Sequence, residues 1–175
     1  QFLSLLNQEE VFEDINVRKA FAYALDRKKI LDFVLQGEGD MPGYHGITPN
    51  TFKNYDVTTI KGYSLDLDSA RYYLAKAGFP GGDGFPEISL DFNPGGMRNK
   101  NVAIEVQKQL SDNLNIKIEL NSMPLSQLVD RATKGESNFF RTGWIADYPS
   151  PENFLWMFYG ADVPDNLEGK SYPNM

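Results

Sequence analysis

The 175-residue sequence contains no cysteine and a single histidine, His45. Without cysteine, the chain has no disulfide, no thiolate nucleophile and no thiolate ligand for zinc. One histidine is too few for a metal centre built from imidazoles, and His45 has no catalytic partner at a recognisable spacing. The Gly-x-Ser-x-Gly, Walker and His-Glu-x-x-His motifs are missing as well. We therefore predict no metal site and no resident cofactor, and a structural or exposed role for His45.

The sequence also lacks long apolar runs and an excess of positive charge. No stretch reaches the roughly 20 apolar residues with which a helix crosses a bilayer. Lysine and arginine together number 17 against 24 aspartates and glutamates, for a formal net charge of −7. Because nucleic-acid binding needs clustered Lys and Arg, no nucleic-acid partner is predicted. A chain of this length buries one core, so we predict a single domain, residues 1–175.

Strand and helix patterns alternate in the second half of the chain. Residues 88–92, 116–120 and 138–144 are typical of strands, and residues 101–114 and 124–135 of the helices between them. Strands separated by helices of this length imply β-α-β crossovers and a largely parallel sheet. The predicted class is therefore α/β, with the three strands in one sheet and helices on both faces.

Three aspartates in the first half, Asp14, Asp26 and Asp66, each precede a helical pattern and are predicted to be N-caps. The helix after Asp26 is predicted to cover residues 27–36 and to end at Gly37. A short apolar run at residues 2–7 indicates one more strand.

Two glycine-containing segments have no helical or strand pattern. Residues 37–61 hold Gly, Pro, Asn and Tyr without sustained periodicity, which favours a long ordered loop. Residues 81–84 (GGDG) are interpreted as a turn, because a phosphate-binding loop would be followed directly by a helix.

The aromatic segment at residues 139–144 is followed by Pro149 and Pro151, which end any strand. Arg141, Trp144 and Asp147 therefore lie at or just beyond the carboxyl end of a strand. In open α/β sheets, ligands bind in the crevice outside the carboxyl ends of the strands. A short apolar run at residues 154–158 is typical of a helix.

Each of these side chains has two interpretations from the residues alone. Asp147 either caps a backbone N–H in the turn or holds a cation of a ligand. Arg141 either pairs with a surface carboxylate or donates to a carboxylate of a ligand, and Trp144 is either core or pocket wall. A carboxylate pair such as Asp147 and Glu152 leaves a hydrolase open as an alternative.

Residues 14–27 (DINVRKAFAYALDR) resemble the D-x-x-V-R-x-A-l-x-x-A-i-D-R segment of family 5 extracellular solute-binding proteins, the oligopeptide- and dipeptide-binding components of bacterial ABC importers. Four further segments resemble motifs of this family and follow the family's order: residues 46–49 (GITP), 66–78 (DLDSARYYLAKAG), 84–86 (GFP) and 143–155 (GWIADYPSPENFL).

The resemblance implies a type II periplasmic-binding-protein-like lobe with three layers. Family members are about three times longer, and neither end of the chain has a closing element, so we expect a fragment covering most of the second lobe. Asp147 would hold the α-ammonium group of a peptide ligand and Arg141 its carboxylate, while Trp144 and Tyr148 would line the same pocket. A binding protein, rather than an enzyme, is expected.

The resemblance also implies partners and a location. The expected partners are a peptide and, through the full-length protein, the membrane permease of an ABC importer, with the protein itself a monomer. The expected location is periplasmic or lipid-anchored outside the cytoplasm. Because family members also bind nickel complexes, haem or oligosaccharides, these solutes remain alternatives, as does an interaction module without a ligand.

Overall fold

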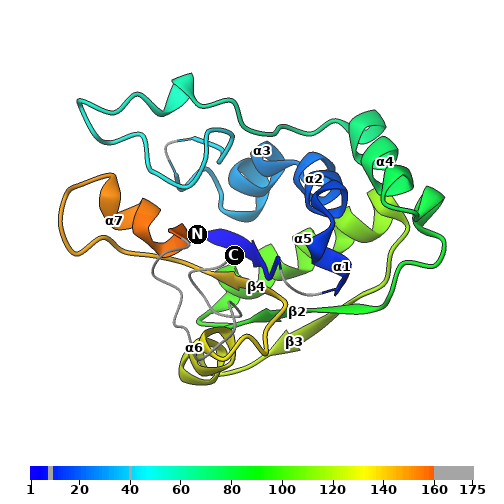
Figure 1. Cartoon of the computed structure of the whole chain (residues 1–175). Coiled ribbons are helices and arrows are strands. Elements are labelled where there is room, and N and C mark those ends of the chain that lie inside the picture. The colour runs from blue at the N-terminus through cyan, green and yellow to red at the C-terminus, as the bar shows by residue number, and fades with distance from the viewer. Residues whose placement is uncertain (8–9, 40, 160–175) are drawn as a thin grey trace.

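The computed structural model describes residues 1–7, 10–39 and 41–159, and in this part of the chain four strands form one sheet. The strands are β1 (Phe2–Leu5), β2 (Ile88–Phe92), β3 (Ile118–Ser122) and β4 (Phe139–Thr142), in the order β1-β4-β2-β3 (Figure 1). β2 pairs in parallel with both β3 and β4, whereas β1 pairs antiparallel with β4. The prediction that the three strands of the second half share one sheet is confirmed.

Helices cover both faces of the sheet (Figure 1). α5 (Met97–Leu114) connects β2 to β3 and packs on one face, with α2 (Ile15–Ala24) and α4 (Leu67–Lys76) against it. α6 (Leu125–Thr133) connects β3 to β4 and packs on the other face. The predicted three-layer α/β class is confirmed.

Two separate cores follow from the alternation of side chains along the strands. Leu90, Phe92 and Phe139 join the larger core, which α2, α4 and α5 complete. Phe140 points to the opposite face and packs with Met123, Leu128 and Ala132 in the smaller core beneath α6. Arg141 follows Phe140 and so shares a face with Phe139, the face that α5 covers. Burial of each large side chain contributes about 1.5–3 kcal/mol.

The three predicted N-caps are confirmed. The carboxylate of Asp14 accepts the amide N–H of Asn16 at 2.7 Å, that of Asp26 accepts from Lys29 at 2.9 Å, and that of Asp66 accepts from Ser69 at 3.0 Å. These bonds satisfy donors that the first turn of a helix leaves without an intrahelical partner.

The helix predicted for residues 27–36 is interrupted. α3 (Arg27–Lys29) is α-helical, but Ile30–Val34 form a π-helical turn, and Gln36 and Gly37 both have positive φ. The wide turn closes through hydrogen bonds from Leu35 N–H to the Ile30 carbonyl and from Gly37 N–H to the Leu31 carbonyl, both 2.9 Å. A π-turn has nearly the same side-chain periodicity as an α-helix over a few residues, so the sequence pattern does not separate the two.

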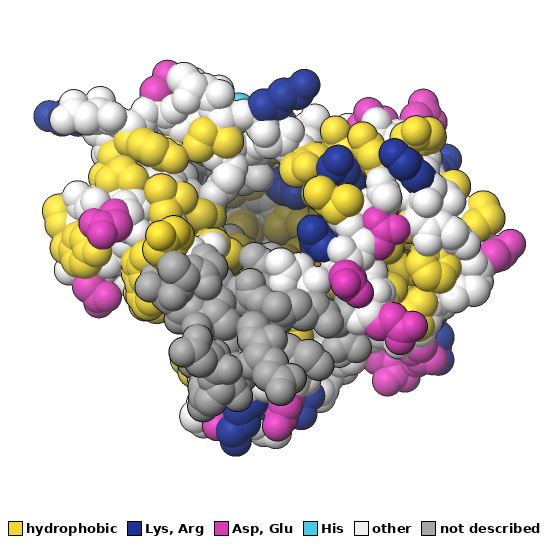
Figure 2. All heavy atoms as spheres, in the orientation of Figure 1, with side chains coloured by type: hydrophobic (Ala, Val, Ile, Leu, Met, Phe, Trp, Pro, Cys, Tyr) yellow, Lys and Arg dark blue, Asp and Glu magenta, His cyan; other side chains and the backbone are white. Residues whose placement is uncertain are grey.

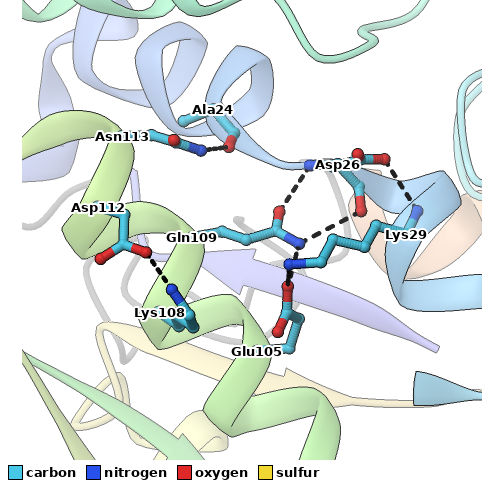
Figure 3. A network of polar contacts seen from close by, with 8 residues as sticks. All are labelled: Ala24, Asp26, Lys29, Glu105, Lys108, Gln109, Asp112 and Asn113. Carbon is cyan, nitrogen blue, oxygen red and sulfur yellow. Dashed lines mark hydrogen bonds and ion pairs between the residues drawn. The ribbon is translucent and has the colours of Figure 1, made fainter. Parts of the chain in front are cut away.

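Side chains of α5 hold the corner between α2 and α3 (Figure 3). The side-chain oxygen of Gln109 accepts the N–H of Asp26 at 2.7 Å, and Asn113 donates to the carbonyl of Ala24 at 2.8 Å. Glu105 accepts from Gln109 at 2.8 Å and pairs with Lys29 at 2.6 Å. Side chains of α5 thereby provide hydrogen-bond partners for the Asp26 N–H and the Ala24 carbonyl, which the break between α2 and α3 leaves without helical partners.

The long loop predicted for residues 37–61 contains one short 3-10 turn, Val57–Thr59, in the part that the structure describes. A Cβ on Gly62 would lie 1.6 Å from the carbonyl oxygen of Tyr44, so this position requires glycine. The remaining short elements are α1 (Glu10–Glu13), a 3-10 turn at Pro80–Gly82, α7 (Glu152–Leu155) and a 3-10 turn at Trp156–Phe158.

Several boundaries differ from the prediction by a few residues. α5 begins four residues early, after Gly96, and β3 begins two residues late because Asn115 ends α5 in the left-handed region. β4 stops at Thr142, so Gly143 and Trp144 lie beyond the strand. The segment 81–84 is a turn with positive φ at its glycines, as predicted.

Candidate functional site

The carboxyl ends of β2, β3 and β4 lie at one edge of the sheet because these strands are parallel. β2 and β4 are neighbours whose outgoing connections diverge, since β2 continues into α5 and β4 continues towards α7 (Figure 1). Such a divergence opens a crevice at the carboxyl ends of the strands, where α/β proteins bind ligands. The predicted site residues belong to β4 and to the loop that follows it.

Arg141, on β4, is buried, with 5% of its surface exposed. One terminal nitrogen of the guanidinium donates to the side-chain oxygen of Asn99, in the first turn of α5, at 2.8 Å. Within the described residues, its Nε has no hydrogen-bond partner and no carboxylate pairs with the guanidinium. Burial lowers the pKa of Arg141 below its ordinary value, although a guanidinium stays protonated at neutral pH. The structure therefore contradicts the interpretation of Arg141 as a surface arginine paired with a carboxylate.

The amino end of α5 lies beside Arg141, since Asn99 of its first turn accepts from the guanidinium, and the neighbouring Arg98 pairs with Glu38. Gly96 occupies the N-cap position with φ 112° and offers no side-chain acceptor to the first turn. Free N–H groups at a helix N-terminus carry partial positive charge and attract anions. The guanidinium and the helix end thus form one electropositive corner at the edge of the sheet.

The loop after β4 is held by Asn153, from α7, whose side chain is 2% exposed. Its side-chain oxygen accepts the indole N–H of Trp144 at 2.6 Å and the backbone N–H of Asp147 at 3.3 Å. Sequence reasoning assigned no role to Asn153. The available signal was its place in the 143–155 motif, three residues after Ser150 and between a proline-rich turn and an apolar run.

The Asp147 carboxylate is exposed and accepts no hydrogen bond from any described residue. A turn cap would require an N–H donor on that carboxylate, whereas here the N–H of Asp147 itself is the group that is bonded. The side chain is therefore accessible to a cation from outside the chain.

Aromatic side chains surround this loop. Trp144 is half-buried and its ring lies edge-on to Trp156, with 6.1 Å between centroids. Tyr148 is exposed, and Phe154 contacts Phe52 of the long loop at 6.2 Å between centroids. Figure 2 shows a hollow on this face, with hydrophobic side chains along one side, towards α7 and the long loop, and Lys or Arg side chains at the other rim.

A surface pocket lined by Tyr44, His45 and residues 58–64 lies within the long loop, and none of the predicted site residues lines it. Nδ1 of His45 lies 2.9 Å from the carbonyl oxygen of Ile60, so this nitrogen carries a proton and donates. This bond ties the loop to itself, which is the structural role predicted for His45.

Residues 1–7, 10–39 and 41–159 contain neither a cluster of metal ligands nor a membrane-spanning helix. No three or more His, Asp or Glu side chains lie close enough together there to hold a metal ion. No helix in the same residues combines the length and apolar character that crossing a membrane requires.

Residues 1–166 match the middle region of the bacterial extracellular solute-binding proteins, family 5. The chain belongs to this family, and the family predicted from its motifs is confirmed.

Individual relatives agree with the family assignment. The oligopeptide-binding protein OppA of Bacillus subtilis is 31% identical over 167 residues, which are 92% of this chain and 30% of that protein. Heme-binding protein A of Haemophilus influenzae is 28% identical over 176 residues, 99% of this chain and 31% of that protein. The crystal structure of a periplasmic oligopeptide-binding protein of Borrelia burgdorferi superimposes with a TM-score of 0.78 at 27% identity, covering 93% of this chain and 31% of that chain. The chain thus spans about three tenths of the length of these relatives.

Proposed function

We propose that the chain is one lobe of a two-lobe solute-binding protein that captures peptides for an ABC importer. The observation that carries this proposal is a pair of unmatched opposite charges at one edge of the sheet. Among the described residues, the carboxylate of Asp147 has no partner and the buried guanidinium of Arg141 has no carboxylate partner. A free peptide has an ammonium group at one end and a carboxylate at the other, so it complements both groups.

The ammonium end is assigned to Asp147. A charge-assisted hydrogen bond between an ammonium and a carboxylate is about twice as strong as a neutral one. The hydrogen bond from the N–H of Asp147 to the side-chain oxygen of Asn153 fixes the loop, so less conformational freedom is lost when a ligand binds. Trp144 and Tyr148 stand on either side of Asp147 in the sequence and would form apolar walls for the first side chain of the peptide.

The carboxylate end is assigned to Arg141 together with the amino end of α5. Arginine presents a fork of donors that matches a carboxylate, and Nε of Arg141, which has no partner among the described residues, would complete it. The helix N-terminus adds favourable charge at the same corner. Because peptide main-chain groups pair with main-chain groups of a protein whatever the side chains are, such a site would accept many sequences.

The alternatives are less well matched to the described residues. A haem or a nickel complex is usually held by histidine, and the one histidine here is bonded to the Ile60 carbonyl within the long loop. An oligosaccharide without charge would leave Arg141 and Asp147 unpaired. A hydrolase needs two carboxylates facing one bond, but Glu152 opens α7, where the helix end accounts for it. We therefore propose a binding protein without catalytic activity.

The proposal extends to location and partners. We infer that the two-lobe protein acts as a monomer outside the cytoplasm, either periplasmic or lipid-anchored, and delivers its ligand to a membrane permease. Its two lobes would close around the peptide like other hinged binding proteins, which would exclude water from Asp147 and Arg141.

Mass spectrometry of ligands that co-purify with the two-lobe protein tests the substrate class. Short peptides with free termini are expected after denaturation of the purified protein. Recovery of haem, a metal chelate or an oligosaccharide in stoichiometric amount would contradict the peptide assignment. Turnover of the bound ligand would contradict the proposal that the protein is not an enzyme.

A further inference from the structure

A buried carboxylate, Asp91, lies on the face of the sheet that α6 covers, with 3% of its surface exposed. It is on β2, between Leu90 and Phe92, which both point to the larger core on the opposite face. The residue opposite Asp91 on β4 is Phe140, which belongs to the smaller core. Burying a carboxylate among apolar groups is costly unless hydrogen bonds compensate it, so its partners indicate what it does.

Four groups from different parts of the chain converge on Asp91. Ser137 donates its hydroxyl to Oδ2, Ser89 donates to Oδ1 at 3.0 Å, and Asn121 of β3 donates to Oδ1 at 2.9 Å. Nε of Arg131, from α6, lies 3.6 Å from Oδ2. One carboxylate thereby joins β2, β3, α6 and the residues that lead into β4.

Ser137 is the partner that matters for the site, because β4 begins two residues after it. Ser137 is only 2% exposed, so solvent water cannot take the place of the Asp91 carboxylate as the acceptor for its hydroxyl. In the chain before β4, Arg131 also donates to the backbone carbonyl of Glu136 at 2.9 Å, which ties the same turn to α6.

Side-chain bonds are important here because β4 and β2 are paired over a short distance. The register is Asp91 opposite Phe140 and Phe92 opposite Arg141. A slip of one residue turns every side chain of a strand to the other face. After such a slip, Arg141 would point towards α6 and away from Asn99 at the amino end of α5.

We propose that Asp91 is a positioning residue, which fixes the register of β4 through Ser137 and so keeps Arg141 on the face of α5. This proposal rests on the proposed function in one respect, namely that Arg141 meets the ligand carboxylate. Asp91 itself does not touch the ligand. The loop that carries Asp147 has a separate anchor in Asn153, so a loosened register affects Arg141 first.

Three serine-to-alanine variants of the two-lobe protein test the register directly. Ser137→Ala removes the bond that links Asp91 to β4. Ser89→Ala removes a bond to the same carboxylate from within β2, and Ser4→Ala removes a buried hydroxyl, 3% exposed, that has no partner within the described residues. Hydrogen exchange of the backbone amides of β4 is expected to be faster in Ser137→Ala alone.

Peptide binding tests the consequence for Arg141. Calorimetry compares a tripeptide that has a free carboxylate with the same tripeptide amidated at its C-terminus. Ser137→Ala is expected to weaken binding of the free acid about five- to tenfold, the equivalent of one hydrogen bond. Binding of the amide is expected to change little, as is the binding of both peptides to the Ser89→Ala and Ser4→Ala variants.

Equal exchange of β4 in the three variants would overturn the register lock. Faster exchange with an unchanged ratio between acid and amide would overturn the positioning of Arg141, provided that Arg141→Lys alters that ratio. If Arg141→Lys leaves the ratio unchanged as well, the carboxylate assignment in the proposed function fails, and the exchange result still decides whether Asp91 fixes the register.

Discussion

Replacement of Asp147 by asparagine tests the ammonium site most directly. Asparagine keeps the shape of the side chain and one acceptor oxygen but removes the negative charge. The carboxylate of Asp147 receives no hydrogen bond from any described residue, so the substitution is expected to leave the fold and its stability unchanged. Any loss of peptide affinity then reports on the ligand rather than on the loop.

The size of the loss depends on burial. In the structure Asp147 is exposed, and an exposed ion pair contributes about 0–1 kcal/mol. When a second lobe closes over the site, the pair is removed from water, and truncating one partner of a buried charge pair costs about 2–5 kcal/mol. We therefore expect Asp147→Asn to weaken peptide binding by the two-lobe protein about 30-fold or more.

The assay is a cycle of four calorimetric titrations. Wild type and Asp147→Asn are each titrated with a free peptide and with the same peptide acetylated at its N-terminus, which has no ammonium group. The coupling between substitution and acetylation isolates the charge pair from other effects. Glu152→Gln is the matched control, since it removes an exposed carboxylate close by on α7. It is expected to leave the affinity for both peptides unchanged.

An equal loss of affinity for the free and the acetylated peptide would refute this reasoning. Asp147 would then act by shaping the loop, and its role as the ammonium site would be wrong. A comparable loss in Glu152→Gln would instead indicate that general negative charge on this face attracts the peptide.

Three further predictions concern the isolated lobe and its stability. The isolated 175-residue chain is expected to bind di- to pentapeptides no more tightly than about 1 mM, or about 4 kcal/mol, because half a clamp leaves the ligand in water; micromolar affinity would contradict the two-lobe proposal. Asn153→Ala leaves two donors unpaired and is expected to lower the free energy of unfolding by about 1–3 kcal/mol, with a shift in tryptophan emission; an unchanged emission spectrum would mean that Asn153 does not hold Trp144. Hydrogen bonds from the backbone N–H and hydroxyl of Ser69 lower the pKa of Asp66 below its ordinary value of 3.8. The stability that this carboxylate contributes is therefore complete above pH 3.8, the pKa in the unfolded chain, and is lost as the pH falls through the lower pKa of the folded state. Denaturant titrations should therefore find that the stability difference between wild type and Asp66→Asn shrinks on acidification, and a growing difference would contradict this.

The order of the strands could not be predicted from local patterns. The β-α-β-α-β pattern indicated one sheet with parallel strands, and that prediction is confirmed. It contained no information on which strands are neighbours, because pairing joins residues that are far apart in the chain. The structure places β4 between β1 and β2, so the strand that carries Arg141 is an inner strand.

The groups that support the site were missed for the same reason. Asn153 acts on a loop that folds back over it, and Asp91 meets Ser137 across 46 positions of sequence. Asparagine, aspartate and serine are common in turns and caps, so their types alone indicate a local role. Only the folded chain brings each one to its partner, Asn153 to the loop after β4 and Asp91 to Ser137 beneath α6.

By itself, the sequence determined what depends on near neighbours. The caps at Asp14, Asp26 and Asp66 are bonds over two or three residues, and alternating apolar positions determine which face of a strand is buried. The ordered motifs determined the family. The tertiary structure alone decided that Arg141 is buried with no carboxylate partner among the described residues while Asp147 stands exposed. Burial and pairing depend on segments that approach each other only when the chain has folded.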